Sequence, residues 1–235
     1  MPKVALRAAL SAALLCASAA AGAQTGASVA LVSDYRYRGV SLSGERPTLR
    51  LDVTHDTSDG WYAGGSLARV ALDSARWQAQ WLGYLGHSFQ LSERLGWDLG
   101  LSAVHFGRES QFDYGEWFTG VQGDRWAWRL HYAPGYFGAG TRTVYAEFSA
   151  ALPLARFTRA LFHTGVLARV GTVRGDAERA RLDASLGLAT TCGVWEWQLD
   201  LTAASRSGSY PAAYGREREN GRGRGALVLS VSHPY

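Results

Sequence analysis

Apolar and polar residues alternate along most of the chain, in short stretches that are separated by glycine-rich or charged links. In residues 195–204, tryptophan, leucine and alanine side chains alternate strictly with Glu196, Gln198, Asp200 and Thr202. A period of two is typical of a β-strand whose two faces lie in different surroundings. This pattern predicts twelve strands, at residues 28–38, 47–56, 61–70, 76–87, 95–105, 114–122, 126–133, 142–152, 161–170, 181–190, 195–204 and 225–235.

The polarity of the strand faces indicates the kind of sheet. In a soluble barrel with a dry core, the apolar face points inward and the charged face points to water. A charged face opposite a tryptophan and leucine face suits the reverse arrangement, with lipid outside the barrel and water inside. The last stretch places Leu227, Leu229 and Val231 on one face and ends at the aromatic Tyr235. We therefore predict an all-β fold, a transmembrane antiparallel up-and-down β-barrel of about 12 strands, with 10 or 14 left open. The alternative interpretation of residues 225–235 is the last strand of a soluble sandwich.

The connections fit the barrel. Links after odd-numbered stretches are generally longer than links after even-numbered ones, as expected for long external loops and short periplasmic turns with both termini in the periplasm. This orientation places four tryptophans near the periplasmic ends of their strands, where an interfacial belt would lie: Trp61, Trp97, Trp126 and Trp195.

The first residues form an export signal rather than part of the fold. Lys3 and Arg7 precede an apolar run, and Ala21-Gly22-Ala23 is a small-residue cleavage site. We predict a signal peptide at residues 1–23 and a barrel at residues 24–235, in the outer membrane of a Gram-negative bacterium. The expected partners are outer-membrane lipid and lipopolysaccharide, the barrel assembly machinery during insertion, and small polar solutes.

Composition excludes several other classes. Without residues 1–23 the chain keeps 22 of its 24 basic residues against 20 acidic ones, which is too balanced for a nucleic-acid binder. Cys192 is then the sole cysteine, so neither an internal disulfide nor a cysteine-rich metal site can form. No pair of histidines has the spacing of two ligands on one strand face, and we expect no metal and no cofactor.

One block resembles a known family. Val32-Ser33-Asp34-Tyr35-Arg36-Tyr37-Arg38-Gly39-Val40-Ser41, followed by Pro47-Thr48-Leu49, is similar to the start of the TorF-like family of bacterial outer-membrane porins. Asp59-Gly60-Trp61-Tyr62-Ala63-Gly64 is also similar to that family, and the detailed likeness covers roughly residues 28 to 70. The resemblance implies an outer-membrane barrel. It implies no site residues.

The same block has a physical interpretation of its own. In an extended strand, Asp34, Arg36 and Arg38 share an inward face near the external mouth, and Gly39 allows a sharp exit into the loop. They form either an arginine–aspartate ladder that braces the wall or a charged constriction that screens solutes.

Twelve strands predict a narrow lumen, because eight are filled by their own side chains and 16 to 18 leave an open channel. The main functional hypothesis is passive diffusion of small polar or charged solutes. The candidate pore-lining residues are charges of both signs: Asp34, Arg36, Arg38, Arg50, Asp52, Asp98, Glu116, Arg129, Glu147, Arg169, Asp183, Glu196 and Asp200. The basic group at Arg36, Arg38 and Arg50 would adjoin the acidic group at Asp183, Glu196 and Asp200 when the barrel closes, and the arginine-rich 205–224 loop would draw anions to the mouth.

Two other functions stay open at this stage. One is a structural or adhesive barrel with no conducting lumen. The other is an outer-membrane hydrolase, for which the candidate groups are the adjacent His87 and Ser88, and His105 with Glu109 and Ser110 nearby in sequence. Such neighbours arise by chance in a chain with six histidines and many serines, so we expect no enzyme.

Overall fold

The computed structural model describes residues 23–72, 76–170, 180–205 and 225–235. The predicted signal peptide, except Ala23, and the predicted 205–224 loop, except Ser205, lie outside the described residues. No helix in the described part of the chain is long and apolar enough to cross a membrane.

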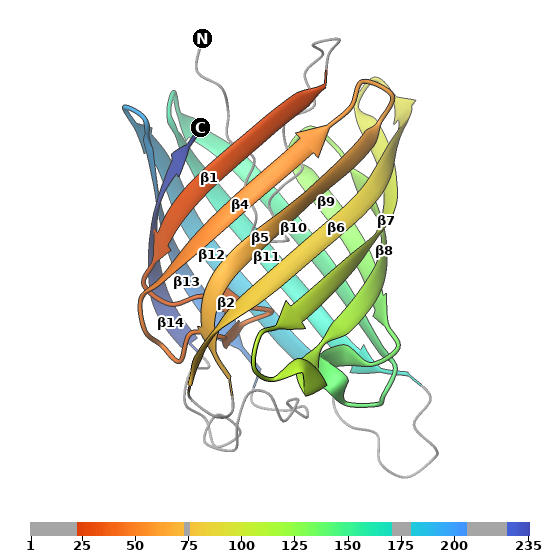
Figure 1. Cartoon of the computed structure of the whole chain (residues 1–235). Helices are drawn as coiled ribbons and strands as arrows, with labels where there is room; N and C mark the ends of the chain where they lie inside the picture. The colour runs from red at the N-terminus through yellow and green to blue at the C-terminus, as the bar shows by residue number, and fades with distance from the viewer. Residues whose placement is uncertain (1–22, 73–75, 171–179, 206–224) are drawn as a thin grey trace.

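Within the described residues, twelve antiparallel strands form a closed barrel (Figure 1). Each strand pairs with the next barrel strand in the chain, and β1 pairs with β14 to close the cylinder, with Leu31 opposite Val231. The strands are β1 (Gln24–Val32), β4 (Thr48–Asp56), β5 (Trp61–Ala71), β6 (Trp77–Ser92), β7 (Leu95–Phe106), β8 (Tyr114–Gln122), β9 (Trp126–Ala133), β10 (Thr143–Ala155), β11 (Thr158–Arg169), β12 (Arg181–Cys192), β13 (Trp195–Ala204) and β14 (Gly225–Pro234). The predicted fold class and strand number are confirmed.

The outer face of the barrel is apolar. Leu49, Leu51 and Val53 of β4 are exposed, as are Leu199 and Leu201 of β13, and the polar side chains between them point inward. Exposed leucine and valine side chains are more stable in contact with lipid than with water. An apolar exterior with a polar interior, as the alternation predicted, is therefore the polarity of a membrane barrel.

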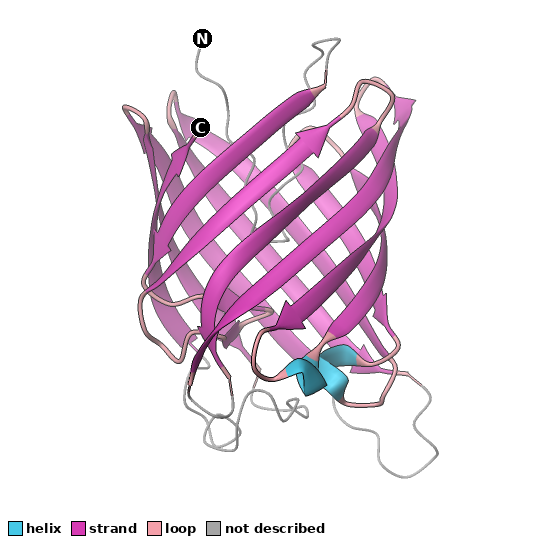
Figure 2. Cartoon of the chain, in the orientation of Figure 1, coloured by secondary structure: helices cyan, strands magenta, loops and turns pink. Residues whose placement is uncertain are grey.

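The two ends of the barrel differ. The start of β1 and the end of β14 lie at one end, called here the turn end, where the strands are joined by short turns (Figure 1). The four tryptophans predicted to form a belt are exposed at the beginnings of their strands, at this end. The opposite, or loop, end holds the longer connections, including the 3₁₀ helices η1 (Ser110–Phe112) and η2 (Tyr136–Gly138) (Figure 2).

The first predicted strand is wrong in its bounds. Residues 28–38 were expected to form one strand, but β1 ends at Val32 and the chain then folds into a small hairpin. Its two short strands are β2 (Arg36–Tyr37) and β3 (Val40–Ser41), and its turn residues Arg38 and Gly39 both have positive φ angles, 48° and 76°. A two-residue turn with two positive φ values matches the twist of the paired strands, so the alternation in this block belongs to a hairpin. We call residues 34–46 the inner hairpin.

The inner hairpin fills the loop end of the lumen. Tyr35 and Tyr37, which the alternation placed on the outer face, are buried inside the barrel. They belong to a cluster that draws on the hairpin, on inward positions of β5 to β11, and on η1 and η2: Tyr35, Tyr37, Val40, Leu42, Ala68, Val70, Leu72, Leu82, Val104, Phe106, Phe112, Tyr114, Ala133, Tyr136, Phe137, Tyr145 and Leu167. The lumen is therefore not uniformly wet, because its loop end has an apolar core.

Candidate functional site

The lumen is the candidate functional site, and a buried ion pair lies in the part of it that the inner hairpin fills. The two terminal nitrogens of Arg38, at the hairpin tip, donate to the two carboxylate oxygens of Glu116 on β8, at 2.7 and 2.8 Å. The rings of Tyr37, Tyr136 and Tyr145 lie 4.9, 5.0 and 4.1 Å from the Arg38 guanidinium carbon. This bidentate pair with aromatic cover holds the hairpin tip across the lumen.

The ion pair also fixes the charge of the hairpin tip. Burial acts to lower the pKa of Arg38, but the facing Glu116 carboxylate and neighbouring tyrosines raise that pKa well above its usual value. Arg38 therefore stays cationic at every physiological pH.

A buried polar network surrounds this pair. His131 on β9 lies 3.4 Å from both Glu116 and Glu147, which places it between two carboxylates. Further around the barrel, an Asp183 oxygen lies 3.1 Å from both the Tyr145 hydroxyl and the His163 ring. These contacts join β8 to β12 across the inner surface.

The hairpin also has internal polar support. The carboxylate of Asp34 accepts hydrogen bonds from the hydroxyls of Ser41 and Ser43, at 2.5 and 3.1 Å, and forms an ion pair with Arg36 at 3.3 Å. The Tyr35 amide donates to the Ser43 hydroxyl at 3.0 Å. Of the two interpretations of the Asp34, Arg36 and Arg38 block, these contacts favour bracing, although they brace a hairpin inside the barrel rather than the wall itself.

The middle of the lumen and the half nearer the turn end are less tightly filled. Tyr62, Tyr84, Arg129 and Asp200 point inward but are only partly buried, so solvent contacts this part of the lumen. Asp98 accepts from Arg129 at 2.8 Å and from the Tyr62 hydroxyl at 2.6 Å. The charges here are placed against the barrel wall in pairs.

Glycines keep the luminal tyrosines close to the wall. A β-carbon placed on Gly64 would lie 2.3 Å from the Tyr84 hydroxyl, and one on Gly86 would lie 2.4 Å from the ring of Tyr62. Each tyrosine thus lies flat over a glycine of a neighbouring strand. Because the rings run along the wall, they leave the axis of the barrel less obstructed.

The predicted pore-lining residues are all buried or half-buried, and most contact a group of opposite charge or a polar side chain. Arg50 pairs with Asp52 at 2.9 Å, and Glu196 pairs with Arg159 at 2.9 Å. The buried members are Asp34, Arg38, Asp52, Asp98, Glu116, Glu147, Asp183 and Glu196, and the half-buried members are Arg36, Arg50, Arg129, Arg169 and Asp200. Their lining of a conducting pore stays a prediction.

Sequence reasoning missed the apolar part of the lumen and the fully buried Arg181, whose side chain donates to the Arg38 carbonyl at 3.4 Å. One signal was available. Val70, Phe106 and Tyr114 occupy inward positions near the loop ends of their strands, where a wet lumen would have polar residues. Three apolar inward residues at one depth indicate a packed core at that depth.

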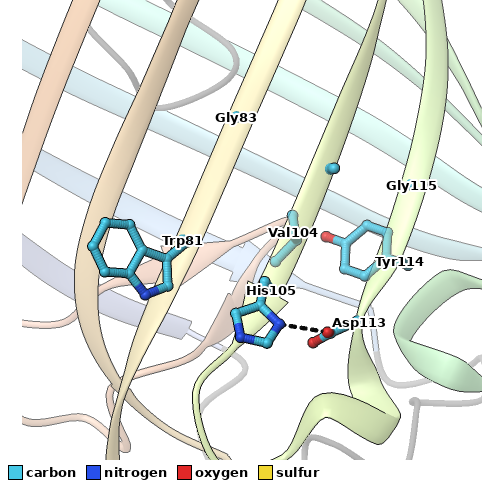
Figure 3. Close-up of a pocket in the computed structure, with 8 residues that line it drawn as sticks. Trp81, Gly83, Val104, His105, Asp113, Tyr114 and Gly115 are labelled. Carbon is cyan, nitrogen blue, oxygen red and sulfur yellow. Dashed lines mark hydrogen bonds and ion pairs between the residues drawn. The ribbon is translucent and has the colours of Figure 1, made fainter.

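The outer face has a groove of its own, of about 560 Å³, lined by Trp81, Gly83, Ala103, Val104, His105, Asp113, Tyr114 and Gly115 (Figure 3).

The histidines considered for hydrolysis have other partners. His105 forms an ion pair with Asp113 at 2.6 Å, and Glu109 is instead buried against Gln78. His87 packs edge-on against Trp61 at 4.9 Å between ring centres. These contacts are the surroundings of the two histidines considered for hydrolysis. Across the described strands and loops, no group of three or more histidine, cysteine or acidic side chains is arranged to hold a metal ion.

Comparison with known proteins gives a family and a fold. A family model described as "Bacterial protein of unknown function (Gcw_chp)" matches residues 16–209. The KdgM porin has a TM-score of 0.55 at 9% sequence identity, over 88% of this chain and 98% of its own, and the NanC porin has a TM-score of 0.56 at 8% identity, over 89% and 98%. A second KdgM structure, in complex with disordered oligogalacturonate, has a TM-score of 0.51 at 8% identity, over 88% and 98%. No curated protein matches the chain significantly. At these identities the likeness concerns the fold alone.

Proposed function

This chain belongs to the Gcw_chp family, and we propose that it is an outer-membrane channel for the passive diffusion of small polar or charged solutes, not an enzyme. The single observation that supports the proposal best is a closed barrel with an apolar exterior and a charged interior that solvent enters. In this proposal the loop end of the barrel faces the outside of the cell. The Val32–Ser41 block supports a place for the chain among the TorF-like porins.

The paired charges of the lumen define the solute class. Asp98 with Arg129, and Arg50 with Asp52, present both signs at one depth. Such pairs attract small polar or zwitterionic solutes without a strong preference for one sign of charge. The KdgM porin structure with disordered oligogalacturonate shows a barrel of this fold with an acidic oligosaccharide, but the mixed lumen here fits a broader range of solutes.

The inner hairpin acts as the gate in this proposal. Leu42 and Phe106, in the cluster around it, have no exposed surface. In this proposal the pore opens when the hairpin leaves the position held by Arg38 and Glu116. The same packed cluster is also the observation that favours the second candidate, a structural or adhesive barrel that does not conduct.

A planar-bilayer recording separates the two candidates. Purified full-length protein should give small, brief conductance steps, and a variant in which a short glycine-serine turn replaces residues 34–46 should give larger and longer ones. The barrel should survive this replacement because β1 and β4 pair directly along their whole length, from Gln24 opposite Asp56 to Val32 opposite Thr48. If neither protein conducts although the electrophoretic mobility of both shifts on heating, as that of a folded barrel does, the non-conducting barrel is the correct function.

The location has a test of its own. Separation of inner and outer membranes should place the protein in the outer membrane, and amino-terminal sequencing should begin at Gln24. Recovery in the soluble periplasm would contradict both the location and the channel.

A further inference from the structure

A group of arginines lies on the outer surface at the loop end of β5 to β7. The guanidinium carbons of Arg46 and Arg69 lie 4.2 and 4.3 Å from the ring centre of Trp77. Arg76 and Arg108 are exposed beside them, next to Trp77 in the chain and at the end of β7. We call these four residues the rim arginines. The Trp77 ring thus holds the guanidinium groups of Arg46 and Arg69 in place at the edge of the apolar surface.

The outer groove lies directly next to the rim arginines, on the membrane side. Arg69 is opposite Ala79 of β6, and Trp81 is the next outward residue along that strand. Below Trp81 the groove floor is made of small residues, with Gly83 opposite Ala103 and Ala103 opposite Gly115. A β-carbon on Gly83 would meet no atom within 4 Å, so the groove is open space beside the exposed Trp81 ring (Figure 3).

We propose that this surface binds a phosphorylated glycolipid of the external leaflet, such as lipopolysaccharide, with an acyl chain in the groove and a headgroup phosphate on Arg46 and Arg69. Guanidinium groups match phosphate in geometry and charge, and the small-residue floor leaves room for a hydrocarbon chain at the matching depth. The proposal rests on the proposed outer-membrane location. It does not require the channel to conduct.

Charge favours a lipid over a second copy of the chain as the occupant. A two-fold contact through the same surface would bring the rim arginines of both copies into one interface. Among the described residues, the exposed carboxylate of Glu45 is next to Arg46 in the chain, and Asp113 is paired with His105. A phosphorylated headgroup neutralises this positive surface, whereas a second copy doubles it.

Lipid binding to the purified full-length protein tests the headgroup contact. Native mass spectrometry in detergent should give about tenfold tighter binding of bisphosphorylated lipid A than of the same lipid without phosphates. Arg46→Ala with Arg69→Ala should remove this preference. Arg94→Ala with Arg125→Ala, in exposed turns at the opposite end, makes the same charge change and should keep it. Equal binding by the two double variants would overturn the headgroup site.

The groove is tested with a second pair of variants. Gly83→Leu fills the groove and should weaken binding of both lipids, because the acyl chain loses its place. Ala184→Leu places the same leucine side chain at an exposed outward position on β12 and should leave binding unchanged. Three outcomes would reject the lipid site: unchanged binding in Gly83→Leu, displacement of the lipid by millimolar inorganic phosphate, or a dimer that only Gly83→Leu disrupts. None of these outcomes depends on conductance.

Discussion

At the scale of single residues, Arg38 decides how the lumen is filled. Its inward position could be read from the alternation, but its role could not. The structure places its guanidinium on Glu116 and among three tyrosine rings, with almost no exposed surface on either partner. A buried ion pair fixes one geometry more effectively than it raises stability. Arg38 therefore determines where the hairpin tip lies.

Glu116→Gln removes the charge that Arg38 faces and should release the hairpin. Breaking a buried pair costs about 3–5 kcal/mol, because one charge is left buried without its partner. We expect longer open times in bilayer recordings and no loss of the barrel on electrophoresis. Arg159→Gln is the control, since its pair with Glu196 is partly exposed and contributes about 1 kcal/mol or less. Identical open times in the two variants would contradict this role of Glu116.

Gly39→Ala should displace the hairpin tip from the opposite wall. The new β-carbon would lie 2.7 Å from the β-carbon of Asp183 and 2.9 Å from that of Ala204. Gly140→Ala is a matched control, because Gly140 also has a positive φ, 64° against 76°, but no atom lies within 4 Å of its added β-carbon. Both variants therefore incur the same backbone strain, about 1–2 kcal/mol, and only the first incurs a collision.

Trypsin measures this difference. In the wild type the bonds after Arg36 and Arg38 are protected by the lumen, and in Gly39→Ala they should be cut many times faster. Protection that is equal in both glycine variants would show that the tip tolerates the added carbon.

At the scale of elements, each strand presents two faces that obey different rules. The outward face needs large apolar side chains. The inward face needs polar and charged groups that can pair with one another in a narrow space. Inward glycines meet the second need. Gly86 and Gly64 accept the rings of Tyr62 and Tyr84 from neighbouring strands, so the paired strands determine each other's luminal shape. A single strand read alone reveals the glycine but not the ring that covers it.

Gly86→Val should narrow the channel by pushing the Tyr62 ring away from the wall. We expect lower conductance in the variant that lacks the inner hairpin, where the wall itself limits flow. Gly83→Val lies on the same strand and points outward into open space, so it should leave conductance unchanged. The comparison uses the same substitution three residues apart. A drop in both variants would indicate general damage to β6 rather than a moved ring.

At the scale of the whole molecule, closure of the barrel joins β1 to β14, so the first and last barrel strands are neighbours. Tyr235 follows β14 at the turn end, where its side chain is 74% exposed and its amide donates to the Ala27 carbonyl at 2.8 Å. Closure also brings the charge groups of β4 and of β12 and β13 into one lumen. Since most of these charges are paired, the field along the axis is weak and strong selectivity between ions is not expected.

Deletion of Tyr235 should reduce insertion in cells while barely changing the finished barrel. A largely exposed side chain adds little packing, whereas a terminal aromatic is a feature that assembly can recognise before folding. The measurements are the amount of outer-membrane protein and the unfolding midpoint of protein refolded in detergent. Tyr235→Phe keeps the aromatic and should insert normally. Full insertion of the truncated chain would remove this role from Tyr235.

The sequence by itself predicted the barrel, about twelve strands with 10 or 14 left open, and the polarity of its two faces. A period of two is a local property, and the ranges predicted for β8, β9 and β13 agree with the structure residue by residue. The signal peptide and the lining role of the charged residues remain predictions.

Only the tertiary structure decided what fills the lumen. Residues 34–41 alternate as a strand does, but their tyrosines point into a core formed by residues from seven barrel strands and two short helices. Glu116 lies 78 residues from the arginine that it binds. Contacts between residues so far apart in sequence depend on which strands the closed barrel brings together. No local pattern of hydrophobic and polar positions encodes that arrangement.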